Sequence, residues 1–214
     1  MLTLVPHWVN VVILAKFHNP TILNPDFLER NAIVPKGWKT TEVLATPPFA
    51  TIRYEKNIVI LLDQERFEIK KECKSFQDNY EIHGIASKYV TILPHVPYNT
   101  IGLNWNLSVK MNEPERFLSE RFIKSEALQE SELDFLQSYI RLSFNVDNAI
   151  FNIDFAPGRA RVTGEDYHPA IIINVNFHYK GPFSIDQIIL KINQWKARED
   201  FFKNIIPKML GIQD

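Results

Sequence analysis

Residues 101–110 read IGLNWNLSVK, and apolar and polar side chains alternate along this stretch. Ile101, Leu103, Trp105 and Leu107 share one parity, whereas small or polar residues stand between them. A period of two predicts a half-buried β-strand with one apolar face, so we expect Trp105 to point into the core. A sheet with one such face needs a covering layer, which favours an α+β fold.

The first half of the chain contains the elements of a ferredoxin-like unit. Asn24 can cap a short helix that begins at Pro25, and apolar residues recur at helical spacing along residues 76–93. Strands are predicted at residues 8–17, 49–54, 58–69 and 101–109. The order β-α-β-β-α-β is that of a ferredoxin-like unit, in which two helices cover one face of an antiparallel sheet. We assign this unit to residues 1–112.

In the second half of the chain, the sequence pattern predicts an α-β-β-β-α unit with an antiparallel sheet over residues 113–214. Its first helix follows Asn112 as the N-cap, and its closing helix starts at Ser184, which forms a capping box with Gln187. We expect that closing helix to reach Ile205 and to end at Pro207. Between the helices, a meander of three strands is predicted at residues 135–144, 150–155 and 171–179.

A short pattern occurs twice. Residues 101–110 and 171–180 both follow I-x-x-N-x-N-x-x-x-K, and a helix is predicted after each copy. One interpretation is that the two strands occupy equivalent places in two related sheets. The other is that asparagine simply fills the solvent-facing side of two antiparallel strands.

Composition places the chain among ordinary globular proteins. The 214 residues include 45% hydrophobic and 23% charged residues, so we expect a folded chain. Cys73 is the only cysteine, which excludes an intramolecular disulfide and favours the reducing cytoplasm. No stretch is long and apolar enough for a membrane helix, and the first residues do not resemble an export signal. We therefore expect no membrane association.

The sequence lacks the motifs of the most common metal-binding, cofactor-binding and catalytic sites. The six histidines lack the spacing of zinc ligands, and there is no phosphate-binding glycine loop or G-x-S-x-G motif, so we predict no metal and no cofactor. Cys73 has no designated base beside it, although the neighbouring lysines could lower its pKa. A net charge of −1 argues against nucleic acid as a partner, although Lys70, Lys71 and Lys74 form a small basic cluster.

Residues 157–169 read PGRARVTGEDYHP and form the stretch that most resembles a binding site. Two arginines could clamp a carboxylate or phosphate, and an acidic neighbour could orient a histidine as a general base. The alternative is a long polar connection whose charges are solvated or paired with one another. The candidate ligand-binding residues are Arg159, Arg161, Glu165, Asp166 and His168.

Residues 92–105, ILPHVPYNTIGLNW, and the strand and helix pattern of residues 171–202 resemble a sporadically distributed family of uncharacterised bacterial proteins. The resemblance rests on hydrophobic pattern and on Pro94, Pro97, Gly102 and Asn104. It implies a bacterial origin and no particular chemistry.

Two functions remain open at this point. The absence of motifs favours a non-enzymatic interaction or assembly module, and the open edges of the second unit's sheet suggest a homodimer, unless the first unit covers them. The alternative is a protein or enzyme that binds a small anionic molecule between the two units, with residues 159–168 at the rim of the pocket.

Overall fold

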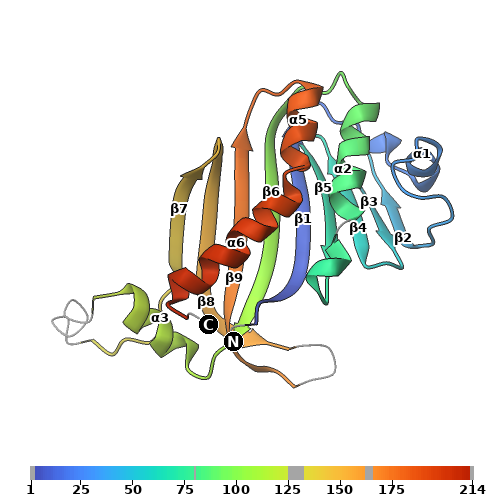
Figure 1. The fold of residues 1–214 in the computed structure, drawn as a ribbon. Helices are drawn as coiled ribbons and strands as arrows, with labels where there is room; N and C mark the ends of the chain where they lie inside the picture. Colours follow the sequence, from blue (N-terminus) through green and yellow to red (C-terminus); the bar gives the residue numbers. More distant parts are fainter. Residues whose placement is uncertain (1–2, 80, 125–132, 162–165, 213–214) are drawn as a thin grey trace.

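The computed structural model describes residues 3–79, 81–124, 133–161 and 166–212. These residues form an α+β fold with a single open sheet of nine strands, in which all neighbouring strands are antiparallel. The strand order is β2-β3-β4-β5-β1-β6-β9-β8-β7, so β2 and β7 are the two edges (Figure 1).

The strands are β1 (Val5–Ala15), β2 (Thr40–Ala45), β3 (Phe49–Tyr54), β4 (Ile58–Asp63), β5 (Arg66–Glu72), β6 (Tyr98–Lys110), β7 (Ile140–Val146), β8 (Ala149–Ala160) and β9 (His168–Lys180). The α-helices among the described residues are α1 (Pro25–Arg30), α2 (Glu81–Ile92), α3 (Pro114–Phe122), α5 (Ile185–Ile192) and α6 (Trp195–Leu210). Short 3-10 helices are η1 (Pro20–Ile22) and η2 (Phe76–Asn79).

Helices α2, α5 and α6 lie over one face of the sheet (Figure 1), and no helix of the described residues lies over the other, which we call the helix-free face. The alternation in β6 directs Trp105 toward the helices, where its ring is buried and lies 4.1 Å from the Trp195 ring of α6. Burial of large aromatic side chains such as these stabilises the fold. The expected position of Trp105 in the core is thus confirmed, and the polar parity of the same strand faces away from the helices.

The two halves of the chain meet at the antiparallel pair β6 and β9. In the first half, β5 folds back to pair with β1, and in the second half, β9 folds back to pair with β6. One sheet therefore runs through both halves. The division of the chain at residue 112 stays a prediction.

The ferredoxin-like arrangement of the first unit is not confirmed. The predicted strand at residues 58–69 is two strands, β4 and β5, and it is β5 that pairs with β1. Asp63 makes the turn between them, because its Oδ1 accepts hydrogen bonds from the backbone N–H groups of Glu65 (2.8 Å) and Arg66 (2.7 Å). The first crossover contains an additional strand, β2, and only the six-residue helix α1.

The predicted meander of the second unit forms, as β7, β8 and β9. The capping box of Ser184 and Gln187 also forms at the start of α5. The expected end of the closing helix is wrong: the helix breaks at residues 193–194, and Pro207 lies inside α6, which ends before Gly211 in the left-handed conformation. Glycine tolerates that conformation at low cost and so ends the helix.

The repeated asparagine pattern does not mark equivalent places in two sheets. Strands β6 and β9 are neighbours, with Asn104 opposite Asn176 and Asn106 opposite Asn174. On the helix-free face, these side chains extend into a row of hydrogen bonds across four strands: Ser143 to Asn152 (2.7 Å), Asn152 to Asn176 (2.9 Å), and Asn176 to Asn104 (2.7 Å). The structure agrees with the second interpretation, in which asparagine fills the side of two antiparallel strands that faces away from the core.

Within the described residues, no helix is long and apolar enough to cross a membrane.

Candidate functional site

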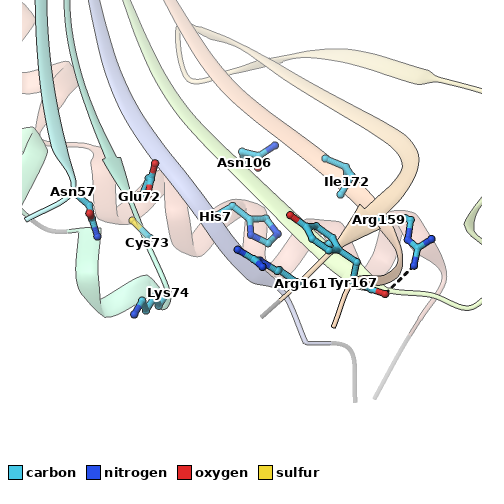
Figure 2. Close-up of a pocket in the computed structure, with 11 residues that line it drawn as sticks. His7, Asn57, Glu72, Cys73, Lys74, Asn106, Arg159, Arg161, Tyr167 and Ile172 are labelled. Carbon is cyan, nitrogen blue, oxygen red and sulfur yellow. Dashed lines mark hydrogen bonds between the residues drawn. The ribbon is translucent and has the colours of Figure 1, made fainter. Parts of the chain in front are cut away.

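A hollow of about 420 Å³ lies at one end of the helix-free face. Its lining comes from both halves of the chain (Figure 2). The residues are His7, Asn57, Glu72, Cys73, Lys74, Asn106, Arg159, Ala160, Arg161, Tyr167 and Ile172, and we call this site the first hollow.

A β-bulge places His7 at this site. The register between β1 and β6 shifts between Pro6 and Trp8, so His7 is the extra residue of β1. A bulge re-aims the side chain of the extra residue, which otherwise would follow the alternation of the strand. His7 Nε2 lies 2.7 Å from Ser108 Oγ, and the His7 carbonyl accepts a hydrogen bond from the Cys73 N–H (2.9 Å). These contacts join the start of β1 to β6 and to the end of β5.

The wall opposite β5 is an extension of β8 and β9, which continue together beyond the end of the sheet (Figure 1). The two strands pack closely there: a Cβ added to Gly158 would lie 2.8 Å from Ile172 Cγ1. The extension carries Arg159, Arg161 and Tyr167. Figure 2 shows Arg161 and Tyr167 beside His7, whereas Arg159 points away from His7 and donates a hydrogen bond to the Tyr167 carbonyl (3.1 Å).

The third part of the lining is the segment 72–74 at the end of β5. Asp78 holds the turn that follows, because its Oδ2 accepts hydrogen bonds from the N–H groups of Lys74 (3.1 Å) and Ser75 (2.9 Å). Cys73 is only 8% exposed, and burial raises the pKa of its thiol to about 12 despite the nearby Lys71 ammonium. Desolvation therefore outweighs the lowering of the thiol pKa that we expected from the neighbouring lysines. Cys73 is a protonated thiol rather than a nucleophile.

The first hollow is cationic although the whole chain is nearly neutral. Among the described residues of the lining, Lys74, Arg159 and Arg161 contribute three positive charges, and Glu72 contributes the only carboxylate. Neither Lys74 nor Arg161 forms an ion pair with a carboxylate of the described residues. The Arg161 guanidinium lies 5.2 Å from the centre of the Tyr167 ring. Such a cluster attracts anions into the hollow.

His7 adds a neutral hydrogen-bonding group. Burial lowers the pKa of His7, and the neighbouring His168 lowers it further, so the imidazole is uncharged at neutral pH. Ser108, its hydrogen-bond partner, is buried and does not line the hollow. The geometry therefore supports holding a ligand rather than nucleophilic attack by Ser108 or Cys73.

Only two of the five candidate residues proposed from the sequence line the first hollow in the described part of the chain. Arg159 and Arg161 line the first hollow. His168 begins β9 opposite Ala160 and is half-buried; it influences His7 without lining the hollow. Asp166 is exposed and is not part of the lining, and Glu165 lies outside the described residues.

Sequence reasoning missed His7, Asn106 and the contribution of segment 72–74 to this site. Those residues are separated in the chain by tens of positions from the arginines, and only the strand pairing brings them together. The basic cluster around Lys74 was the one available signal.

Within the described residues, no group of three or more His, Cys, Asp or Glu side chains could hold a metal ion. No protein-family model matches the chain, and no curated protein matches it. The resemblance to the sporadically distributed bacterial family stays a prediction.

Proposed function

We propose that the protein binds a small anionic molecule in the first hollow. The observation that carries this proposal is that Lys74, Arg159 and Arg161, from two distant parts of the chain, line one hollow in which Glu72 is the only carboxylate among the described residues. Arginine suits this role because its planar guanidinium can donate two parallel hydrogen bonds to a carboxylate or phosphate. Neutral His7 and the Asn106 amide supply further hydrogen-bonding groups.

Inorganic phosphate and sulfate are suitable first probes, measured by thermal unfolding and by titration calorimetry at matched ionic strength. A ligand that binds only the folded state stabilises it by about 2.7 kcal/mol at a concentration of 100 times Kd. We expect phosphate to raise Tm in the wild-type protein and Arg161→Gln to remove most of that increase. Glu72→Gln should have the opposite effect and tighten binding, because it removes the negative charge of Glu72 from the lining.

Arg30→Gln is the matched control. Arg30 is an exposed arginine of α1, pairs only weakly with Asp26 at 3.8 Å, and does not line the hollow. It should leave the response to phosphate unchanged. If phosphate gives no more stabilisation than sodium chloride of equal ionic strength, or if Arg30→Gln and Arg161→Gln behave alike, the proposal is wrong.

A second candidate function is self-association through the edge strand β7. Among the described residues, this strand pairs with β8 alone, and its single charge, Arg141, is neutralised by two hydrogen bonds to Asp154 (2.6 and 2.7 Å). Edge strands of stable monomers are commonly protected by charges or proline, whereas β7 contains no proline and only this one paired charge. Large apolar side chains are exposed on and before it: Leu136 (83%), Tyr139 (68%) and Phe144 (41%).

The partner that fits this edge is a second copy, because antiparallel pairing of β7 with itself is symmetric about a two-fold axis. Light scattering on a size-exclusion column over a concentration series tests the idea. We expect a dimer that Phe144→Arg dissociates and that Leu190→Arg, a change at an exposed leucine of α5, leaves intact. A wild-type monomer at every concentration would eliminate this candidate.

A further inference from the structure

A second hollow of about 270 Å³ adjoins the first on the helix-free face. Asn57 and Glu72 line both, so the two hollows are adjacent, and we call them together the groove. The second hollow is lined by Arg53, Asn57, Val59, Leu61, Glu68, Lys70 and Glu72.

The floor of the second hollow is apolar. Val59 and Leu61 alternate along β4 with the buried residues Ile58, Ile60 and Leu62, so their side chains face away from the helices. In the sheet, Val59 lies opposite Lys70 of β5 and Leu61 lies opposite Glu68. The apolar side chains of Val59 and Leu61 on the helix-free face therefore lie beside the cationic site.

Three of the four charged residues around this floor, Arg53, Glu68 and Lys70, already have partners. Arg53 pairs with Glu42 at 3.5 Å, and the Lys70 ammonium lies 4.4 Å above the centre of the Trp8 ring. Glu68 accepts a hydrogen bond from Asn10 (2.6 Å) and pairs with Arg66. The first hollow, by contrast, offers Lys74 and Arg161 without such ion pairs among the described residues, so the two ends of the groove differ in chemistry.

We infer that the ligand is a small soluble amphiphile, with an anionic phosphate or carboxylate head in the first hollow and an alkyl or aryl tail on Val59 and Leu61. This inference rests on the proposed anion-binding function and deepens it. A ligand that spans both hollows matches the usual form of small-molecule sites, in which apolar area supplies affinity and a few polar groups fix orientation.

The test is a titration series of inorganic phosphate and of ethyl, butyl and hexyl phosphate. Burial of one methylene group corresponds to about a four-fold change in an equilibrium constant when burial is complete. In an open groove, we expect Kd to fall by about two-fold or more for each added methylene that reaches the floor. Hexanoate, measured beside hexyl phosphate, shows which anionic head is preferred.

Val59→Thr is the discriminating variant, because it keeps the β-branched shape and replaces a methyl group with a hydroxyl group. It should weaken the binding of hexyl phosphate several-fold and leave the binding of inorganic phosphate unchanged. Val43→Thr, the same change at an exposed position of β2, is the control and should alter neither ligand.

The outcomes of these measurements distinguish the amphiphilic ligand from the anion-binding function on which it rests. Binding of phosphate that depends on Arg161 but not on chain length would overturn the amphiphile and leave anion binding intact. Failure of hexanoate and of every phosphate to bind would overturn both. Co-sedimentation with vesicles of phosphatidylglycerol and phosphatidylcholine tests a membrane source of the same head group; binding to them that depends on Arg161 would overturn the assignment to a soluble ligand.

Discussion

Asn104 and Asn176 lie directly opposite each other in β6 and β9, and Asn176 Nδ2 donates a hydrogen bond to Asn104 Oδ1 at 2.7 Å. Asn176 also accepts a hydrogen bond from Asn152 at 2.9 Å, so one half-buried amide links three strands. Cross-strand pairs of this kind stabilise sheets beyond their backbone hydrogen bonds.

Asn176→Ala should therefore lower the free energy of unfolding by about 2 kcal/mol, because a typical hydrogen bond contributes about 1 kcal/mol. Urea denaturation measures the difference. Asn174→Ala is the matched comparison: Asn174 is more exposed and accepts one side-chain hydrogen bond, from Asn106 at 2.8 Å, so the loss should be about half as large. Equal losses would show that the row of amides contributes little.

Gly158→Ala should strain the extension of β8 and β9. The new Cβ would lie 2.8 Å from Ile172 Cγ1, and overpacking of this kind costs about 1–3 kcal/mol. Adding Ile172→Ala should recover part of that loss, which a double-mutant cycle in urea detects as a coupling of about 0.5 kcal/mol or more. In contrast, Gly84→Ala in α2 meets nothing within 4 Å and should stabilise the protein by about 0.5–1 kcal/mol. Additive effects of the Gly158 and Ile172 changes would argue against the close contact.

Cys73 should react slowly with iodoacetamide in the folded protein. Because burial raises the pKa of the thiol to about 12, we expect alkylation at pH 8 to be at least about 100-fold slower than in urea-unfolded protein. Mass spectrometry of time points gives the rates. The double variant Cys73→Ala, Lys74→Cys moves the thiol to an exposed neighbouring position and should be labelled rapidly. Equal rates for folded and unfolded wild-type protein would contradict the buried position.

Stability should decline in mild acid because of His18. This side chain is only 4% exposed, Tyr89 Oη lies 3.0 Å from its Nδ1, and burial lowers its pKa to about 4, with Asp63 opposing the change. Below pH 6.5 the unfolded chain binds a proton that the folded chain excludes, so the free energy of unfolding falls between pH 6.5 and pH 4. At about 1.4 kcal/mol for each pH unit, the full loss is about 3 kcal/mol.

The measurement is a set of urea denaturation curves between pH 7 and pH 4 for wild type and His18→Asn. Asparagine can still bond to Tyr89 but does not titrate. The difference in unfolding free energy between the two proteins should change by about 3 kcal/mol across this range. A constant difference would show that His18 is not responsible.

Local features of the chain and the pairing of strands that follow each other in the meander were predictable, whereas the pairing of strands distant in the sequence was not. The period of two in residues 101–110 predicts the strand and the inward position of Trp105, and Ser184 with Gln187 marks the start of α5. The turn between β4 and β5 was missed because it contains neither glycine nor proline; the Asp63 side chain forms it instead. That one turn changes which strand pairs with β1.

The same distinction applies to the candidate site. Arg159 and Arg161 were identified because they are concentrated in one polar stretch of sequence. His7 could not be found in this way, since its position depends on a bulge opposite β6, about a hundred residues later in the chain. Glu165 was proposed as well and lies outside the described residues.

The pairing of β1 with β6 also has a consequence for synthesis on the ribosome. Val9 of β1 is the partner of Trp105, so the chain must grow by nearly a hundred residues before β1 gains its second neighbour. Until then, a nascent chain that has already paired β1 with β5 presents the other side of β1, rich in valine and isoleucine, as an open edge. Such edges recruit other chains. We therefore expect slow elongation between codons 70 and 110 to favour aggregation over native folding.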